Sequence, residues 1–552
     1  MIANYKVFDI EAYNWNKVYA IGIYNGKETK MLVNNYYTNN AFIEWLLNNL
    51  QNGDIIYAHN GGRYDFLFIF DYLRENKKAK LQNIKVISSS VVMFKINYKG
   101  KTLEFRDSFS ILPASLKRLT NDFDVLHKKL EMDYDIGTED VRFQDYFTND
   151  LIGLYEVLEQ AKELREKLTI ASNSMHIFLR DYYKKKPYNN SLETDNTFRA
   201  GYYGGRVEVF KMQGESLHYY DVNSLYPSVM VEQEYPVLEK NNWEYTTKYI
   251  KNELGYYYCH IEAPKMEIPL LPYHRIDGKL LFPYGKWAGW YYSPEIDKAK
   301  EIGYNIKVDK GYVFPKTDFL FKDFVEHYYE IKKNSSGSKK AIAKMVLNSL
   351  YGKFAQRHIY DTYVIGNEES RYSYIPFLNL QRKKTETFSR YQHTEIAGFI
   401  TSYARLKLYN LFEKAGLDRV YYCDTDSLFT DSLMHTSNEL GDIKNEADVK
   451  EFIAIAPKVY AYIKDTGEVV IKAKGLNSSK LSFEDFKNAH YNNDYSKFNN
   501  KYTHPASFKA YNIRHLKNFT DTLEITRQLR GIYDKRIILQ NGVDTEPYKI
   551  EG

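Results

Sequence analysis

Cysteine is almost absent from this chain, which has only two, Cys259 and Cys423, among 552 residues. Two distant cysteines exclude a zinc site built from several thiolates and argue against a disulfide framework. Long apolar runs are also lacking, since none approaches the length that crosses a membrane. The chain begins Met1-Ile2-Ala3 and its first acidic motif starts at Asp9, which leaves no room for a presequence. We therefore expect no membrane association and a cytoplasmic location.

A large excess of one charge is missing too. The chain has 76 Lys and Arg against 71 Asp and Glu, a formal net charge of +5. This balance fits an enzyme with a basic nucleic-acid groove and acidic metal sites, but it does not require one. Tyrosine is abundant, with 53 residues whose rings can stack on bases, although coding bias explains the same count. The length predicts two to four domains.

The first 170 or so residues mix strand and helix patterns. Residues 5–10, 18–24 and 54–59 are predicted strands and residues 41–50 a predicted helix, which indicates an α/β domain. The polar stretch 172–200 is interpreted as a connecting region.

The rest of the chain contains a second set of strands and helices. A predicted strand leads into an acidic motif at Asp221. A long helical pattern covers 321–354 with a break at 334–337, and another helix is expected at 395–414. Residues 357–393 are expected to be irregular and polar, and the C-terminal residues are basic and polar.

Two acids lie close together in the segment 420–429. Apolar and aromatic residues flank Asp424-Thr425-Asp426, a pattern that predicts a strand, a turn and a strand. Two carboxylates one residue apart repel each other unless a cation neutralises them. Mg²⁺ uses one or two carboxylates and keeps its other positions for water and phosphate, so such a pair suits nucleotide chemistry. By itself, however, this motif is more often an ordinary acidic turn.

Asp221 supplies a second carboxylate from a distant strand, as a two-metal site requires. In such a site one metal lowers the pKa of the attacking hydroxyl, and the other neutralises the triphosphate and the leaving group. Tyr226 follows closely, where its ring either blocks a ribose 2′-hydroxyl or packs in the core. The two motifs together predict nucleotidyl transfer at metals held by Asp221 and Asp424.

A predicted helix between these motifs carries a cationic stripe. Spacings of four, four and three residues place its members on one face: Lys340, Lys344, Asn348 and Tyr351. Another side of the helix is apolar and is expected to be buried: Ile342, Val346 and Leu350. Such a stripe can grip a triphosphate while the tyrosine ring faces a base. A solvated lysine face is the alternative, but it does not explain the asparagine and the tyrosine.

Four N-terminal acids come from three separate segments. Asp9 and Glu11 end the first strand and share its face, because residues two apart in a strand point the same way. Asp65 follows the third strand, and Asp150 lies in a helical context one turn after Tyr146. Four such acids can hold two metals for phosphodiester hydrolysis, with Tyr146 positioning the attacking water. Scattered surface acids are the alternative for any single pair.

The motifs together resemble those of family B DNA polymerases. Asp221-x-x-Ser-Leu-Tyr-Pro, Lys344-x-x-x-Asn-Ser-Leu-Tyr-Gly and Tyr422-Cys-Asp-Thr-Asp-Ser follow the order of that family's motifs A, B and C. End to end, the chain is similar to the compact protein-primed branch of bacteriophages whose linear genomes carry a terminal protein. The resemblance implies a mixed α+β multidomain fold. An RNase H-like 3′–5′ exonuclease domain would precede a right-hand polymerase of palm, fingers and thumb with two insertions.

The resemblance also divides the chain into units. These are the exonuclease domain (1–171), the linker and first palm part with motif A (172–230), insertion 1 (231–319), the fingers with motif B (320–356), insertion 2 (357–393), the palm with motif C and Lys-x-Tyr (394–475) and the thumb (476–552). The first insertion would dock the priming protein, and the second would help to enclose DNA for processive strand displacement. Ordinary surface elaborations are the alternative. If the insertions enclose DNA, binding to the phosphates should weaken with salt.

For the polymerase site the resemblance implies a role for each matching residue. The metal ligands would be Asp221, Val222 and Asp424, and Asp426 would shape the site or contact a metal transiently. Tyr226 would select the sugar. The residues expected near the nucleotide or template are Lys332, Lys340, Lys344, Asn348 and Tyr351. The expected DNA contacts are Tyr202, Gly204 and Gly205 of a Tyr-x-Gly-Gly motif, and Lys458 and Tyr460 of a Lys-x-Tyr motif that holds the primer terminus.

The N-terminal segments resemble the three exonuclease motifs of proofreading polymerases. The implied metal ligands are Asp9, Glu11, Asp65 and Asp150, with Tyr146 as the catalytic tyrosine and Lys129 as an assisting lysine. Asn60, Tyr64 and Ser108 would contact the DNA strand. Two positions depart from the family: Ala12 replaces a threonine, and Ser108-Phe109 replaces a Ser/Thr-Leu motif. Neither departure affects the metal ligands, so we expect an active nuclease.

The implied cofactor is Mg²⁺, two ions at each site, for which Mn²⁺ can substitute. The implied partners are a DNA primer-template, dNTPs and a terminal protein. We expect a monomer that works in the bacterial cytoplasm if a phage encodes it. Two other functions stay open: a family B polymerase that uses an ordinary nucleic-acid primer, and a nuclease or single-strand-binding protein with an inactive palm. Tyr226 argues against an enzyme that uses ribonucleotides.

Overall fold

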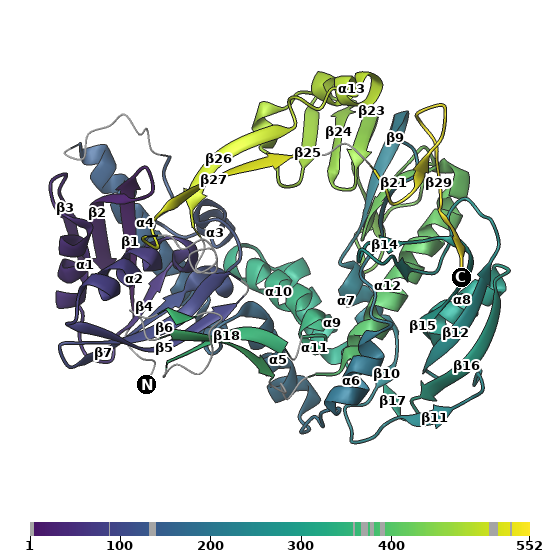
Figure 1. Cartoon of the computed structure of the whole chain (residues 1–552), viewed down its shortest axis with the longest axis horizontal. Coiled ribbons are helices and arrows are strands. Elements are labelled where there is room, and N and C mark those ends of the chain that lie inside the picture. Colours follow the sequence, from purple (N-terminus) through teal and green to yellow (C-terminus); the bar gives the residue numbers. More distant parts are fainter. Residues whose placement is uncertain are drawn as a thin grey trace.

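A computed structural model describes residues 5–87, 89–131, 140–356, 359–365, 374–375, 380–386, 392–506, 517–529 and 533–552. Figure 1 shows an N-terminal lobe and a larger second lobe, with helices between them and a two-stranded hairpin reaching across at the top. The first lobe holds a seven-stranded sheet, and the second holds another seven-stranded sheet and a five-stranded one. Within the described residues, no helix combines the length and the apolar character needed to cross a bilayer.

The N-terminal sheet is buried on both faces. Its order is β3-β2-β1-β4-β7-β6-β5, and the three central strands run parallel. The strands are β1 (Tyr5–Tyr13), β2 (Lys17–Tyr24), β3 (Thr29–Val33), β4 (Ile55–Ala58), β5 (Ala79–Ile87), β6 (Ser90–Tyr98) and β7 (Lys101–Asp107). The main helices are α1 (Asn39–Asn48), α2 (Asp65–Glu75), α3 (Leu116–Asp122) and α4 (Val141–Gln160). The predicted strands and the first predicted helix are confirmed.

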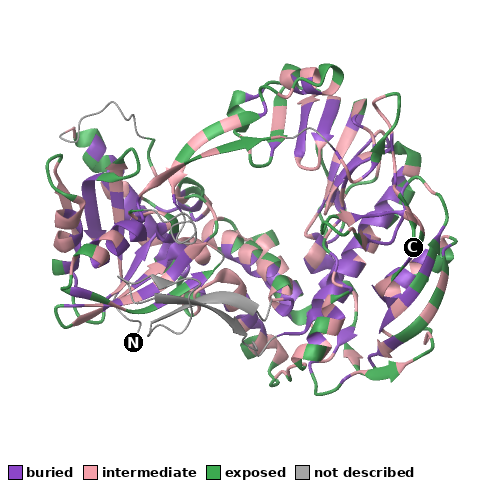
Figure 2. Ribbon diagram, viewed as in Figure 1, coloured by how far each residue is buried: buried purple, intermediate pink, exposed green. Residues whose placement is uncertain are grey.

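Alternation along β1 decides which helix each residue meets. Phe8 and Ile10 belong to the core that includes α1 and α2, whereas Val7 belongs to the core that includes α4. Figure 2 shows this burial running through the centre of the lobe. Because residues two apart in a strand share a face, Asp9 and Glu11 point to the same side as Val7, toward α4.

Residues 172–200, interpreted from the sequence as a connecting region, are largely helical. The structure has α5 (Ile170–Ile177), the short helical segment η4 (Phe178–Tyr183) and α6 (Leu192–Arg199) there. The polar residues 184–190, which suggested a loop, do lie between these helices, and other polar residues of the stretch act as a helix cap or a buried donor. The Ser191 hydroxyl accepts a hydrogen bond from the Thr194 N–H at the start of α6, and the Asn173 amide donates to the Leu164 carbonyl at 2.6 Å.

The second seven-stranded sheet is antiparallel throughout, in the order β25-β24-β23-β9-β22-β21-β8. Its strands are β8 (Val207–Val209), β9 (Gln213–Val222), β21 (Val420–Asp424), β22 (Ser427–Thr430), β23 (Ile443–Ala456), β24 (Val459–Lys464) and β25 (Val469–Ala473). Helices α7 (Leu225–Glu232) and α12 (Thr394–Ala415) share one core with β21 and β22. The helix predicted at 395–414 is therefore confirmed.

The long helical pattern does break as predicted. It forms α9 (Lys322–Asn334), α10 (Gly337–Ser349) and α11 (Tyr351–Phe354). Gly337 has a φ of +57°, which a glycine adopts without strain. The apolar side of α10 is buried as expected, while Lys344 and Asn348 are exposed.

The segment between α7 and α9 supplies four strands of a five-stranded sheet, and the end of the chain supplies the fifth, in the order β11-β16-β12-β15-β30. The strands and the helix beside them are β11 (Glu244–Thr246), β12 (Gly255–Ala263), β15 (Tyr284–Tyr292), α8 (Ser293–Glu301), β16 (Asn305–Val313) and β30 (Lys549–Glu551). Two-stranded pairs accompany it: β10 (Tyr235–Pro236) with β17 (Thr317–Asp318), and β13 (Tyr273–His274) with β14 (Leu280–Leu281).

The last strand, β30, pairs in parallel with β15, so the end of the chain returns to this sheet. The resemblance assigned all of residues 476–552 to the thumb. In the structure, the last strand of this range belongs to the five-stranded sheet instead. The middle part holds α13 (Phe483–Asn492), β26 (Asn499–Pro505) and β27 (Thr522–Gln528), and the later pair is β28 (Ile537–Ile538) with β29 (Thr545–Glu546). Pairing between strands this far apart leaves no local pattern in the sequence.

Residues 357–393 are not irregular throughout. β18 (Ile359–Ile365) and β20 (Leu380–Glu386) pair antiparallel, with β19 (Tyr374–Ile375) beside β20. β18 lies against β5 of the N-terminal lobe (Figure 1). The other residues of this predicted insertion, up to 391, lie outside the described residues.

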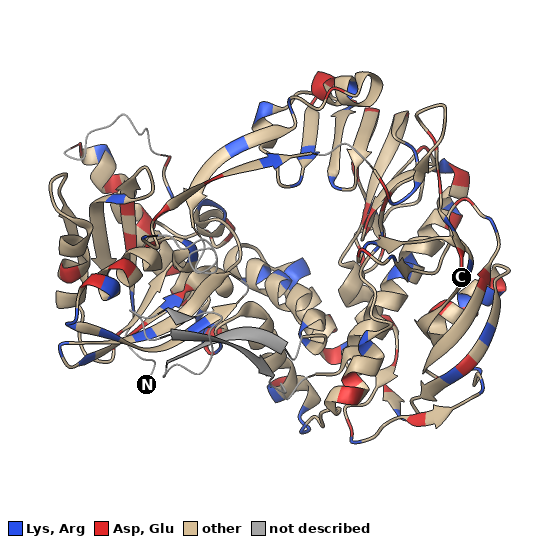
Figure 3. Cartoon of the chain, in the orientation of Figure 1, with Lys and Arg blue, Asp and Glu red and all other residues tan. Residues whose placement is uncertain are grey.

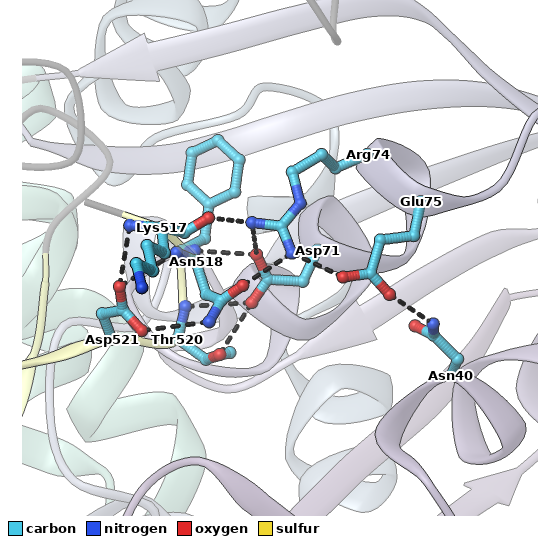
Figure 4. Close-up of polar contacts among 9 residues, drawn as sticks. Asn40, Asp71, Arg74, Glu75, Lys517, Asn518, Thr520 and Asp521 are labelled. Carbon is cyan, nitrogen blue, oxygen red and sulfur yellow. Dashed lines mark hydrogen bonds and ion pairs between the residues drawn. The ribbon is translucent and has the colours of Figure 1, made fainter. Parts of the chain in front are cut away.

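The turn at residues 517–521, just before β27, is docked on helix α2 of the N-terminal lobe (Figure 4). Phe519 is fully buried there and contacts Phe70, with ring centroids 5.5 Å apart. The Asp71 carboxylate accepts hydrogen bonds from the Phe519 N–H at 2.7 Å and from the Thr520 N–H and hydroxyl. Arg74 donates to the Asn518 side chain at 2.6 Å and to the Lys517 carbonyl. The hairpin is thus fastened at its far end to the other lobe.

Replacing Phe519 with alanine should release this turn from α2. Truncating a buried phenylalanine to alanine costs about 3–5 kcal/mol. We expect faster hydrogen–deuterium exchange in residues 517–529 while the central sheet strands stay protected. Thr526, exposed on β27, gives the matched control Thr526→Ala. Unchanged exchange in the Phe519→Ala protein would contradict the docking.

Candidate active sites

The acids of the second lobe meet at one edge of its sheet. Asp221 pairs with Ser427 across β9 and β22, so it lies beside the turn Asp424–Ser427. Thr425 has a φ of +64°, and its N–H donates to the Arg206 carbonyl at 2.7 Å. The Val222 N–H donates to the Asp426 carbonyl at 2.7 Å. Strand register and this tight turn bring together acids that are about 200 residues apart in the sequence.

Burial and mutual repulsion disfavour the ionised forms of Asp221 and Asp426. Burial, together with the negative charge of Asp426, raises the pKa of Asp221 to about 6. Burial, opposed by a backbone hydrogen bond and reinforced by Asp424, raises the pKa of Asp426. Such a cluster is stabilised by any cation that binds it. The acids of this cluster offer only oxygen atoms as metal ligands, which suits Mg²⁺.

Two lysines lie on these acids, and one of them was not anticipated. The Lys458 ammonium contacts both carboxylate oxygens of Asp424, at 2.5 and 2.7 Å. Lys444, opposite Asp221 on β23, lies 3.8 Å from that carboxylate and also pairs with Glu446. The sequence singled out Lys458 by its motif but gave no signal for Lys444, whose position depends on strand register.

The predicted nucleotide residues lie beside the same edge. Lys332 donates to the Asn223 side chain at 3.1 Å and to the Ser224 hydroxyl at 2.8 Å. Burial and the neighbouring Lys344 lower the pKa of Lys332. Lys340 and Lys344 are exposed on α10, where the ribbon in Figure 3 carries the blue of basic residues. These ammonium groups form a region suited to a polyphosphate.

Two predicted pocket aromatics stack on each other. The rings of Tyr226 and Tyr351 have centroids 4.2 Å apart and lie 15° from parallel. Tyr460 is instead buried, 4.9 Å from the Tyr422 ring, so it supports the strand that carries Asp424. Tyr351 is only partly buried, and the stack therefore borders the surface where Asn348 is exposed.

The Tyr-x-Gly-Gly segment passes directly over the turn Asp424–Ser427. A Cβ at Gly205 would lie 2.9 Å from the Thr425 methyl and 3.2 Å from the Tyr226 hydroxyl, so only glycine fits without a shift. Arg405 holds the segment by donating to the Tyr203 and Gly204 carbonyls at 2.7 and 3.0 Å. Tyr202, the first residue of the motif, is partly buried.

The N-terminal acids form a second cluster. Asp9, Glu11 and Asp150 offer carboxylate oxygens that all lie within 4.8 Å of one another. Asp65 starts α2 and accepts a hydrogen bond from the Ile10 N–H at 3.1 Å, beside the same strand. Asp150 Oδ1 is buried and has no hydrogen-bond partner among the described residues. A bare, buried carboxylate oxygen facing other acids fits a metal ligand.

Lys129 and Tyr146 complete this cluster. The Lys129 ammonium donates to the Tyr146 hydroxyl at 3.1 Å and forms an ion pair with Asp150. It also lies 4.7 Å from the centre of the Tyr146 ring. The structure therefore brings together the lysine, the tyrosine and the aspartate that the family motifs singled out separately. The nearby residues 132–139, which follow the Lys129 segment, lie outside the described residues.

Burial makes these acids hard to ionise together. It raises the pKa of Glu11 to about 7 and that of Asp65 to about 8. Burial and the charge of Asp65 raise the pKa of Asp9 well above its ordinary range. At neutral pH the cluster therefore holds protons that a bound cation would displace.

Thermal stability in a chelator should fall as the pH rises from about 5 to about 8. The folded state keeps protons on Glu11 and Asp65 in a range where the unfolded chain has released them, so higher pH favours unfolding. Millimolar Mg²⁺ should remove most of this slope, because it binds the ionised form. Differential scanning calorimetry with Glu11→Gln provides the comparison: a pH slope equal to that of the wild type would contradict the assignment.

The residues predicted to contact the DNA strand lie in different environments. Asn60 has a φ of +62° at the turn before Asp65, and Tyr64 lies 5.6 Å from the ring of Trp15. Ser108, by contrast, is fully buried, and its hydroxyl donates to the Ala58 carbonyl at 3.1 Å. A direct DNA contact is therefore not available to Ser108 in this structure. The motif places this residue but cannot tell that its side chain faces inward.

Comparison with known proteins gives a consistent result. A family model described as DNA polymerase type B, organellar and viral, matches residues 48–144 and 140–446. The DNA polymerase of Bacillus phage phi29 is 30% identical over 447 residues, covering 72% of this chain and 73% of the relative. A probable DNA polymerase of Podospora anserina is 30% identical over 659 residues, covering 88% of this chain and 54% of the relative. The chain spans about half the length of that relative and of those from Ascobolus immersus and Neurospora intermedia, at 54%, 44% and 58%.

Solved structures show the same fold. The phi29 DNA polymerase complexed with primer-template DNA and incoming nucleotide substrates matches with a TM-score of 0.75 at 23% sequence identity. The match covers 95% of this chain and 100% of that chain. The mixed α+β multidomain fold that the sequence predicted is thereby confirmed.

Proposed function

Since this chain belongs to the type B DNA polymerases of organelles and viruses, we propose that it is a template-directed DNA polymerase with a 3′–5′ proofreading exonuclease. The observation that carries the proposal is the presence of two separate carboxylate clusters. Asp221 lies near the end of β9 and Asp424 ends β21, two strands of one sheet. Asp9, Glu11 and Asp150 lie together in the other lobe. One cluster suits synthesis and the other hydrolysis, because both reactions use metal-bound phosphate.

In synthesis, Asp221, Asp424 and the backbone of Val222 would hold Mg²⁺. When bound, the metal supplies an activated primer hydroxyl and neutralises the triphosphate. Lys332, Lys340 and Lys344 would bind the triphosphate oxygens and orient the α-phosphorus toward the primer. The primer oxygen then forms a bond to that phosphorus as the bond to pyrophosphate breaks. Asp426 would act on the pKa of Asp221, and Asn348 would line the nucleotide pocket.

In proofreading, Asp9, Glu11, Asp65 and Asp150 would hold Mg²⁺, which supplies an activated water. The Tyr146 hydroxyl, already hydrogen-bonded to Lys129, would orient that water toward the terminal phosphodiester. Asn60 and Tyr64 would hold the frayed 3′ end.

A primed template with dNTPs and Mg²⁺ tests the proposal directly. Extension of the primer, together with shortening of single-stranded DNA when dNTPs are withheld, is the expected result. Absence of extension by the wild-type protein at every dNTP concentration would refute polymerase activity. Degradation without synthesis would favour the alternative of a nuclease with an inactive palm.

We further propose that synthesis starts from a protein primer. Support comes from the two segments that separate the sequence motifs, one of which forms the five-stranded sheet closed by β30. This sheet would dock the terminal protein, and residues 357–393 would help to enclose DNA. The test is transfer of labelled dNMP to a tyrosine, serine or threonine hydroxyl of the cognate partner. If no covalent product forms while a DNA primer is extended, an ordinary nucleic-acid primer is used.

Replacing Tyr226 with valine should weaken the selection against ribonucleotides. The ring stacks on Tyr351 beside Gly205, where it would meet the 2′-hydroxyl of a ribonucleotide. Its loss removes a steric clash, so the ratio of kcat/KM values for dNTP and rNTP should fall about tenfold or more. Single-nucleotide incorporation measures the ratio. Tyr226→Phe keeps the ring, and equal loss of selection in both variants would exclude a steric role.

A further inference from the structure

Trp15 lies in the tight turn between β1 and β2, in a backbone conformation that tryptophan rarely adopts. Asn14 and Trp15 are the central residues of this turn, with φ values of +48° and +69°. The Asn16 N–H donates to the Tyr13 carbonyl at 3.1 Å and closes the turn. Two positive φ values are the pattern of a type I′ turn, which prefers asparagine followed by glycine. A bulky residue at the second position is therefore strained, and such strain is concentrated at functional sites.

The turn is anchored at its base by helix α1. Asn39, the first residue of α1, donates from its side-chain amide to the Asn16 carbonyl at 2.7 Å and accepts from the Val18 N–H at 3.0 Å. Trp15 itself is 48% exposed. A single exposed apolar residue needs no explanation, but a tryptophan kept at a strained position of an anchored turn presents a flat ring in a fixed place.

The ring lies beside the N-terminal acid cluster. It contacts the Tyr64 ring edge to face, with centroids 5.6 Å apart. Tyr64 directly precedes Asp65, at the start of α2. Burial and the negative charge of Asp65 raise the pKa of Tyr64, and the charges of Glu11 and Asp9 act in the same direction. Trp15 therefore borders the acids through Tyr64.

We propose that Trp15 is a stacking platform for the bases of an unpaired DNA 3′ end whose terminal phosphodiester lies at the acid cluster. This rests on the proposed function, because it assumes that the cluster hydrolyses DNA. Stacking on an aromatic ring holds ends of any sequence, since every base has a π-face. A paired base is already stacked on its neighbours and joined to its partner, so the platform favours frayed ends over paired ones.

Binding of a short single-stranded oligonucleotide in EDTA, measured by fluorescence anisotropy, tests the proposal. Trp15→Gly removes the ring and gives the turn its preferred residue, so the melting temperature should equal or exceed that of the wild type. The affinity should nevertheless fall about fivefold or more. An oligonucleotide with abasic nucleotides at its 3′ end should bind the two proteins almost equally. Trp15→Phe, which keeps a smaller ring, should retain most of the affinity.

Excision in Mg²⁺ gives a second measurement. The KM of Trp15→Gly for single-stranded DNA should rise by a factor similar to its loss of affinity, while kcat changes little, because the ring binds the strand without touching the reacting phosphate. A fall in kcat at an unchanged KM would overturn the proposal, since the ring would then support the acids instead of holding a base.

Tyr37→Ala is the matched control. Tyr37 is 49% exposed in the same lobe and packs edge-on against Phe42 of α1 instead of against Tyr64. An equal loss of affinity in Tyr37→Ala and Trp15→Gly would overturn the proposal, as would unchanged affinity in Trp15→Gly. A difference that persists on the abasic oligonucleotide would overturn it too, because the ring would then act on the fold and not on a base. If the wild type binds the oligonucleotide but does not shorten it in Mg²⁺, the proposed exonuclease is wrong, which is a separate result.

Discussion

Replacing Asp424 with asparagine should lower the rate of nucleotide incorporation about 10³-fold or more, while the rate of single-stranded DNA degradation stays unchanged. The amide keeps the size of the side chain but removes the charge that would hold a metal at the turn Asp424–Ser427. A metal supplies several kcal/mol of charge stabilisation in the transition state, and each ~1.4 kcal/mol is a factor of ten in rate. Pre-steady-state single-nucleotide incorporation measures the loss.

Stability should not account for this loss. The ion pair of Asp424 with Lys458 is partly exposed, and such pairs contribute about 1 kcal/mol or less to folding. Asp418, exposed just before β21, provides the matched control Asp418→Asn, which should polymerise at the wild-type rate. An Asp424→Asn enzyme that retains more than a tenth of wild-type incorporation would remove Asp424 from the metal site.

Replacing Asp150 with asparagine should give the opposite separation of activities. Excision of a 3′-terminal nucleotide should fall about 10³-fold, with primer extension on a matched template intact. Asp150 supplies the buried oxygen without a hydrogen-bond partner among the described residues, and it also pairs with Lys129. Its charge therefore serves both the metal and the lysine that orients Tyr146. Time courses on a 5′-labelled single strand measure excision.

The same substitution should not unfold the protein. It removes one negative charge from a cluster in which Asp9 and Glu11 already hold raised pKa values, so the melting temperature in a chelator should stay equal or rise near pH 8. Asp145, exposed five residues earlier on α4, provides the control Asp145→Asn. Full excision activity in a folded Asp150→Asn protein would show that hydrolysis occurs elsewhere.

The sequence by itself located the residues on which the proposed chemistry of this protein depends. Asp221, Asp424 and the α10 stripe were found because acid spacing and helical period are local properties of the chain. The break before Gly337 and the strands that carry Asp9 and Asp221 follow from the same short-range signals. Motif order then joined these pieces into one site, although each motif alone has a common structural explanation.

Only the tertiary structure decided which distant partners each residue has. Phe519 is docked on Asp71 across 448 residues, and Lys458 contacts Asp424 because a turn with positive φ directs it there. Ser108 faces inward, and β30 returns to β15. Strand register and packing between lobes are set by many residues at once, so no short pattern encodes them. The acids of the two clusters and the lysines Lys129 and Lys458 were therefore readable in the sequence, whereas the contacts between them and the fastening between the lobes required the fold.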